Sequence, residues 1–196
     1  MAQGIRGSAS GYLELMTDAV SPGSLSASQC CELPSELVTG HRAIDAEHRQ
    51  LLLGMANLRA VCGFHLRVAD CKACQENQRG VCENSLVTML GDLLSFVIEH
   101  FRNEEQVMRD SLLLMVERDV CEAHIEDHAA ISSKVQQIVA SLDPLYTVVL
   151  IRELDTLLTR WVSNHITLHD QLLVRWVERE DSVLRQGAHP QARLMP

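Results

Sequence analysis

The stretch LLTRWVSNHITLHDQLLVRW, residues 157–176, shows the pattern that decides the fold. Its apolar residues recur at steps of three and four, which is the spacing of one face of an α-helix. His165 stands on the same face as Leu157 and Trp161. We therefore predict a long amphipathic helix over residues 146–184 that directs a polar side chain into its own buried face.

Three upstream segments show the same periodicity of apolar side chains. We predict helices over residues 41–61, 84–113 and 116–142. The Asp143-Pro144 pair marks the end of the third, because proline disfavours helical backbone in the residue before it. Four amphipathic helices with mostly short connections predict an all-α fold, an up-down-up-down four-helix bundle.

Length and composition fit a single domain, since 46% of the 196 residues are hydrophobic. We expect a Ser-, Gly- and Ala-rich N-terminal tail over residues 1–34 that is disordered or partly helical, the bundle over 35–184, and a C-terminal tail over 185–196. The formal charge of −9 argues against a nucleic-acid partner, because phosphates would be repelled. We identify no secretory pattern and no membrane-spanning run, and so expect a cytoplasmic protein without membrane insertion.

The predicted inward faces carry seven residues of types that bind metals. They are His48, His100, Glu104, His124, His128, His165 and Asp170. One histidine on an apolar face is usually a core residue with a single hydrogen bond. Two carboxylates among five histidines need more, because charged carboxylates are rarely buried unless they are paired or bound to a metal. Imidazole and carboxylate suit iron, zinc, copper or nickel, and seven ligands fit two octahedral ions with bridging carboxylates. We predict two irons.

The spacing of these ligands is regular on the middle two helices and irregular on the last. The strings HFRNE (100–104) and HIEDH (124–128) each place two ligands one turn apart, about 40° around a helix. On a regular helix His165 and Asp170 would lie roughly 140° apart, whereas His169 lies one turn from His165. Asp170 requires either a longer reach or a π-type turn.

Four strings occur in order: IDAEH (44–48), HFRNEE (100–105), HIEDH (124–128) and HITLHD (165–170). Together they resemble the hemerythrins, particularly the bacterial hemerythrin-like proteins, over about residues 36–180. The resemblance implies a four-helix bundle that holds a non-haem di-iron centre and binds dioxygen reversibly.

The resemblance also implies a role for each ligand, with three histidines on one iron, two on the other and two shared carboxylates. The three-histidine set is His124, His128 and His165. The two-histidine set is His48 and His100. The bridging carboxylates are Glu104 and Asp170, which favours Asp170 over His169. The apolar pocket for oxygen is formed by Leu51, Trp161, Val162 and Ile166. Core packing at helical spacing explains the pocket residues equally well.

An open position on the two-histidine iron, in apolar surroundings that lack a proton donor, favours binding of dioxygen over catalysis. We therefore expect an oxygen carrier, store or delivery protein. Two alternatives remain open. One is a sensor of oxygen or redox state that signals to a separate partner through a cysteine-rich insert. The other is a protein that handles nitric oxide or peroxide or supplies iron for repair.

The insert, at about residues 62–83, lies between the first two predicted helices and departs from the resemblance. Its candidate ligands are Cys62, Cys71, Cys74, Cys82 and His65. One CxxC with two flanking thiols is compatible with a tetrahedral zinc site, in which His65 could replace one thiol. A thiol–disulfide switch and unliganded cysteines are the alternatives, and the sequence does not decide between them.

Overall fold

The structure is a computed structural model that describes residues 32–187. Most of the predicted N-terminal tail, including the segment expected to be partly helical, and residues 188–196 of the predicted C-terminal tail lie outside these residues. The described residues all belong to one compact unit. They form only helices and connections, without a strand, so the predicted all-α fold is confirmed.

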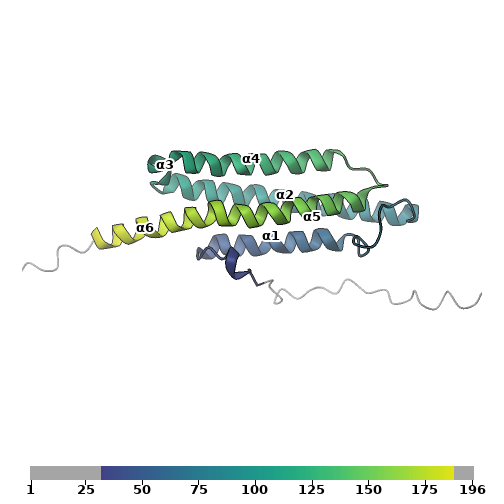
Figure 1. The fold of residues 1–196 in the computed structure, drawn as a ribbon, viewed down its shortest axis with the longest axis horizontal. Helices are drawn as coiled ribbons and strands as arrows, with labels where there is room; N and C mark the ends of the chain where they lie inside the picture. The colour runs from purple at the N-terminus through teal and green to yellow at the C-terminus, as the bar shows by residue number, and fades with distance from the viewer. Residues whose placement is uncertain (1–31, 188–196) are drawn as a thin grey trace, which may run out of the picture. The chain divides into compact units, whose positions relative to one another are not determined.

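Four long helical segments lie side by side and alternate in direction (Figure 1). In chain order they are α1 (Arg42–Ala60), α2 (Glu76–Asp110), α4 (Arg118–Ala140), and the continuous run of α5 (Thr147–His165), the π-helix η2 (Ile166–Asp170) and α6 (Gln171–Gly187). Two short elements complete the fold, the 3-10 helix η1 (Ser35–Leu37) and α3 (Leu113–Val116). The α1–α2 and α4–α5 connections lie at the same end of the bundle.

The start of α1 is fixed by local hydrogen bonds. The Asp45 carboxylate accepts hydrogen bonds from the backbone N–H and the hydroxyl of Thr39, both at 2.8 Å. Gly40, between them, has a φ of +91°, a conformation that favours glycine. The helix therefore begins at a defined residue, which sets the rotation of the face that carries His48.

Two of the predicted helix boundaries are wrong. α2 begins at Glu76, eight residues before the predicted start at residue 84, because residues 76–83 contain no proline and mostly tolerate a helix. The last part of the predicted insert, with Cys82, is therefore helical. α2 ends at Asp110, since the extended backbone at Ser111 stops the helix before the short α3 begins.

α2 also differs from the expectation that no segment could span a membrane. By length and composition alone it is long enough, and over one 18-residue window apolar enough, to do so. Core helices of soluble proteins pass the same test. In the bundle α2 packs against α1, α3, α4 and α5.

The apolar core is divided into two clusters. The large cluster lies toward the insert and includes Leu51, Phe101, Ile131 and Ile166. The small cluster contains Met108, Leu113, Cys121 and Leu173. On each of α2, α4 and the α5–α6 run, the candidate metal ligands fall between residues of the two clusters.

Candidate metal centre

The seven predicted ligands come together in the interior of the bundle. α1 supplies His48, α2 supplies His100 and Glu104, and α4 supplies His124 and His128. The last helical run supplies His165 and Asp170. All seven residues are buried, none with more than 3% of its surface exposed. Seven polar side chains at this depth need partners to offset the loss of water.

The π-helix η2 resolves the irregular spacing on the last helix. Its five residues, Ile166–Asp170, follow His165 directly, and the wider turn brings i and i+5 onto the same face. Asp170 Oδ1 lies 3.0 Å from His165 Nε2. His169, which a regular helix would favour, instead stacks on the His124 ring at a centroid distance of 5.0 Å.

The ligand atoms form two groups that share Glu104. One group is Glu104, His124, His128 and His165, and the other is His48, His100, Glu104 and Asp170. In the first group, His165 Nε2 lies 3.2 Å from His128 Nε2 and 3.3 Å from His124 Nε2. Ligand atoms at right angles around an ion with bonds near 2.1 Å are about 3 Å apart, so this spacing fits one metal ion.

Each carboxylate divides its two oxygens between the groups. Glu104 Oε2 lies 3.2 Å from His128 Nε2, while its Oε1 lies 3.4 Å from His100 Nε2. Asp170 Oδ1 faces His165, while its Oδ2 lies 3.0 Å from His48 Nε2. This is the arrangement of carboxylates that bridge two cations.

A cation at the two-histidine group would satisfy buried atoms that form no hydrogen bond of good geometry. Six side-chain atoms there lack one: both ring nitrogens of His48, Nε2 of His100, Oε1 of Glu104, and both carboxylate oxygens of Asp170. Each unsatisfied buried polar atom costs about 1–3 kcal/mol. The residues present therefore fit a pair of metal ions with imidazole and carboxylate ligands.

The charges inside the cluster are strongly coupled. Burial and the adjacent Asp170 oppose ionisation of Glu104, but hydrogen bonds from three histidines outweigh them and hold its pKa well below the usual range. Burial opposes protonation of His165, but hydrogen bonds to Asp127, Asp170 and Glu104 outweigh it and raise its pKa to about 11. Without a metal ion, the cluster thus keeps a proton on His165 to balance its carboxylates.

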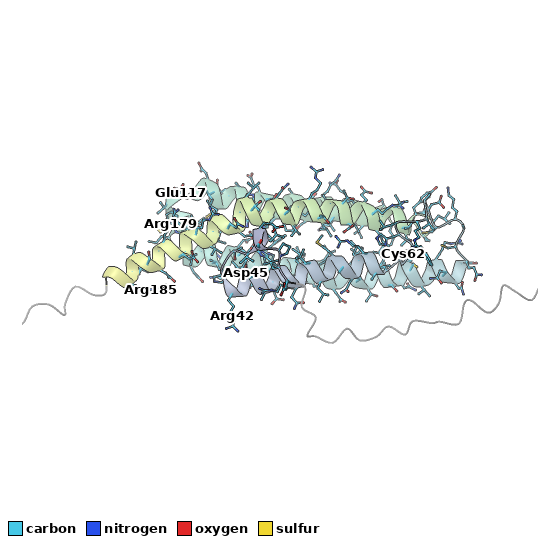
Figure 2. All side chains as sticks on the ribbon, turned by 60° about the horizontal axis from the view of Figure 1, so that its bottom comes forward. Arg42, Asp45, Cys62, Glu117, Arg179 and Arg185 are labelled. Carbon is cyan, nitrogen blue, oxygen red and sulfur yellow. The ribbon has the colours of Figure 1, made fainter. Side chains whose placement is uncertain are left out.

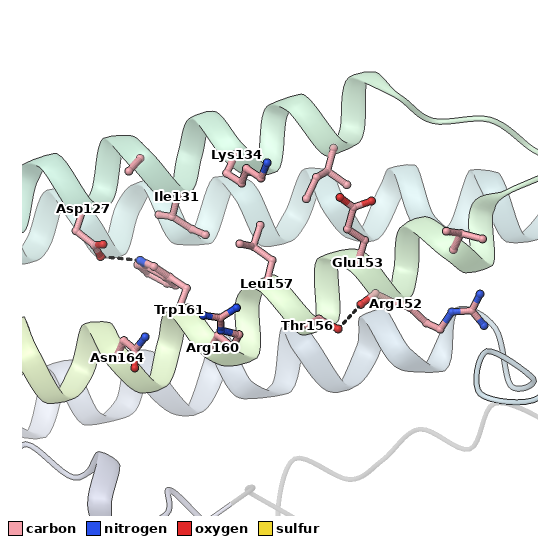
Figure 3. Close-up of a pocket in the computed structure, with 13 residues that line it drawn as sticks. Asp127, Ile131, Lys134, Arg152, Glu153, Thr156, Leu157, Arg160, Trp161 and Asn164 are labelled. Atoms are coloured by element: carbon pink, nitrogen blue, oxygen red, sulfur yellow. Dashed lines mark hydrogen bonds between the residues drawn. The ribbon is translucent and has the colours of Figure 1, made fainter.

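Carboxylates outside the ligand set orient the histidine rings. His165 Nδ1 donates to Asp127 Oδ2 at 2.7 Å, and Trp161 Nε1 donates to the same oxygen at 2.6 Å (Figure 3). His100 Nδ1 donates to Glu47 at 2.8 Å, and the Asn103 amide donates to the other Glu47 oxygen at 2.7 Å. Such bonds fix the ring and its tautomer, leaving Nε2 free to bind a metal.

The sequence interpretation missed these orienting carboxylates, although a signal was present. Glu47 directly precedes His48, and Asp127 directly precedes His128. Each carboxylate, however, accepts a hydrogen bond from a histidine on another helix and not from the histidine that follows it in sequence. Helix packing decides this pairing, and spacing along one helix does not reveal it.

Replacing Asp127 with alanine is expected to weaken metal binding by about 10- to 100-fold, because His165 loses its orienting partner. Competition with a chelator of known affinity measures the change. Glu126→Ala is the matched control, since Glu126 is exposed on the same helix. Equal affinities for the two variants would show that Asp127 does not act through His165.

The four residues assigned to an oxygen pocket are all buried. Leu51 lies one turn after His48 on α1, and Val162 one turn before His165 on α5. Trp161 stacks on the His165 ring at 4.5 Å. Ile166 follows His165 and is 1% exposed. All four belong to the large apolar cluster, and in sequence each lies within four residues of His48 or His165.

The cysteine-rich insert does not form a comparable group. Among residues 32–187, no three of its candidate ligands have ligand atoms within 4.8 Å of one another. These candidates are Cys62, Cys71, Cys74, Cys82 and His65. The described cysteines are free thiols. His65 Nδ1 lies 2.9 Å from the Cys62 carbonyl oxygen. A ready tetrahedral zinc site is therefore absent from the described insert.

Comparison with known proteins identifies one family. The family model described as the hemerythrin HHE cation binding domain matches residues 39–177 of this chain, which include all seven predicted ligands. No curated protein and no solved structure matches the chain significantly.

Proposed function

Because this chain belongs to the hemerythrin family of HHE cation-binding domains, we propose that its buried ligands hold two iron ions and bind dioxygen reversibly. The family and the ligand types support a metal site of histidine and carboxylate. Two carboxylates placed to bridge support two ions. Two ferrous ions would supply the electrons that dioxygen accepts on binding and returns on release.

The unequal number of histidines in the two groups carries this proposal. If both carboxylates were shared, an ion at the three-histidine position would be held by five protein ligands, and an ion at the two-histidine position by four. A six-coordinate ion at the second position would keep room for a small molecule. The group with His48 and His100 is therefore the position at which a bound ion would have room for dioxygen.

The apolar side chains near the centre support reversible binding over turnover. Leu51, Val162 and Ile166 carry no polar side-chain atom, and the Trp161 indole N–H is already donated to Asp127. These four side chains therefore offer no proton to bound oxygen, and proton donation is what reductive turnover needs. Their burial also keeps water from the site.

The proposal is tested with the full-length, iron-loaded and chemically reduced protein. About one dioxygen per two irons is expected to bind, as measured by oxygen uptake and the accompanying change in absorbance. Purging with argon should restore the reduced spectrum over repeated cycles. Irreversible oxidation at the first exposure to oxygen would contradict reversible binding, and failure to retain iron would contradict the metal assignment.

Val162→Thr is expected to shorten the lifetime of the oxygenated protein several-fold. Threonine has nearly the shape of valine but brings a hydroxyl that can donate a proton or hold a water molecule near the site. The rate of spontaneous oxidation in air measures the effect. Val149→Thr is the control, because Val149 lies on the same helix and is 38% exposed. An unchanged rate for Val162→Thr would show that dryness at this position does not protect the oxygenated state.

A further inference from the structure

The cysteine-rich insert contains a tight turn that brings two thiols close in the chain. The Cys74 N–H donates to the Cys71 carbonyl oxygen at 3.1 Å, the hydrogen bond that closes a β-turn. The Cα atoms at the ends of such a turn are within about 7 Å, and disulfides join Cα atoms about 4.4–6.8 Å apart. The backbone at Cys71 and Cys74 is thus already suited to a disulfide.

The two thiols differ in access. Cys71 is buried, with 6% of its surface exposed, whereas Cys74 is only half-buried. A small reagent in solution therefore reaches Cys74 first, and Cys71 lies three residues away to complete the bond. Cys62 is a poorer candidate, because burial and the neighbouring thiols of Cys82, Cys71 and Cys74 raise its pKa and disfavour the reactive thiolate.

The turn is attached to the first residues of α5. Cys71 Sγ accepts the Val148 N–H at 3.4 Å, and the Cys71 N–H donates to the Leu145 carbonyl oxygen at 2.9 Å. Cys71 thereby satisfies one of the N–H groups that a helix leaves free in its first turn. Any change at the Cys71 sulfur acts directly on the start of α5.

An arginine holds the rest of the loop to the same helix. The Arg152 guanidinium donates to the carbonyl oxygens of His65, Val68 and Ala69 at 3.0, 2.7 and 2.8 Å. Figure 3 shows Arg152 extending from α5 at the end of the groove between α4 and α5. Figure 2 shows Cys62 at the same end of the bundle, where α1 leads into the loop. Hydrogen bonds at both Cys71 and Arg152 therefore connect the insert to α5.

We infer that Cys71 and Cys74 form a reversible disulfide in response to the thiol redox state of the surroundings. Formation of this disulfide changes the hydrogen bonding at the start of α5, because Cys71 Sγ accepts the Val148 N–H. The inference goes beyond oxygen binding and does not depend on it. The oxidant is a low-molecular-weight disulfide. The Cys74 thiolate attacks one of its sulfurs, which forms a mixed disulfide and releases one thiolate. The Cys71 thiolate then attacks the Cys74 sulfur, which closes the internal disulfide and releases the second thiolate. Two protein thiols are oxidised, one disulfide is reduced, and their two protons pass to the released thiolates or to buffer.

The test uses the full-length, iron-loaded protein equilibrated without air in mixtures of reduced and oxidised glutathione. Acid quenching, alkylation and peptide mapping then identify the linked cysteines. We expect loss of two alkylatable thiols and a Cys71–Cys74 link as the mixture becomes more oxidising. Mapping separates this link from any bond between Cys30 and Cys31.

Two variants identify the pair. Cys74→Ser should abolish the link, whereas Cys82→Ser should leave its midpoint unchanged. Hydrogen exchange should change several-fold at the first amides of α5, including Val148, between reduced and oxidised protein. The Cys74→Ser protein should lose this response.

Three results would overturn the inference. The four insert thiols could remain alkylatable in every glutathione mixture, or the link could join Cys62 to Cys82. The protein could also retain zinc that shields these thiols until a chelator is added, which would identify the insert as a metal site. Oxygen binding is measured separately and can succeed or fail without changing any of these results.

Discussion

Protein with the Glu104→Gln substitution is expected to bind no more than one iron per chain, where we expect the unchanged protein to bind two. Glutamine has the shape of glutamate, but it is neutral and one of its two oxygens is replaced by an amide nitrogen that cannot bind a cation. Glu104 is the residue common to both ligand groups, so its loss weakens both. Loss of a residue that merely orients a ligand costs 10- to 100-fold in metal affinity, and loss of a shared ligand should cost at least about 100-fold.

Iron analysis after gel filtration, together with chelator competition, measures this effect. Glu99→Gln is the matched control, because Glu99 lies on α2 and is exposed to solvent. It should retain both irons. Two tightly bound irons in the Glu104→Gln protein would show that this carboxylate does not bridge, and would exclude the shared-ligand arrangement.

The metal-free protein is expected to lose stability as the pH rises above about 6.5. Hydrogen bonds to Asp127, Asp170 and Glu104 outweigh burial and raise the pKa of His165 from 6.5 to about 11. Between these values the folded chain keeps a proton that the unfolded chain has lost. The stabilisation from His165 is therefore fully present below pH 6.5 and disappears as the pH approaches 11. A shift of one pKa unit corresponds to about 1.4 kcal/mol, so the total decrease should be on the order of a few kcal/mol.

Iron binding should reverse this pH dependence. A metal ion requires the unprotonated Nε2 of His165, so binding releases the proton and is favoured as the pH rises. Urea unfolding of metal-free and iron-loaded protein at pH 6, 8 and 9.5 tests both statements. The two stabilities should diverge with pH. A flat profile for the metal-free protein would show that His165 is not protonated in the folded chain.

The sequence was sufficient to predict the fold because each helix has a clear apolar face. On each helix, apolar residues recur at steps of three and four. Examples from the four helices are Leu51, Leu86, Ile131 and Leu154, and all of them are buried. Helix ends were harder to place, as at Glu76, since several residues before residue 84 tolerate a helix as readily as a loop. The sequence contains no strong stop signal there.

The inward position of most predicted ligands could be read from the pattern, because a side chain that binds a metal inside a bundle must lie on an inward face. The exception was Asp170, where regular geometry favours His169 and only the observed π-turn brings Asp170 inward. A π-turn has no simple sequence signature. It arises when tertiary contacts, here of Asp170 with His48 and His124, compensate for its weaker local hydrogen bonding.

The division of the core into two clusters gives the metal ligands a role in how the bundle unfolds. The small cluster has four fully buried members, and alone it provides little cohesion for α3 and the start of α6. The predicted metal ligands lie between the two clusters and come from every long helix. Metal ions bound there would link the end of the bundle that holds the small cluster to the large cluster. Their removal would allow the small end to fray while the rest stays folded. Iron supply would then decide whether the chain melts in one cooperative step or in two.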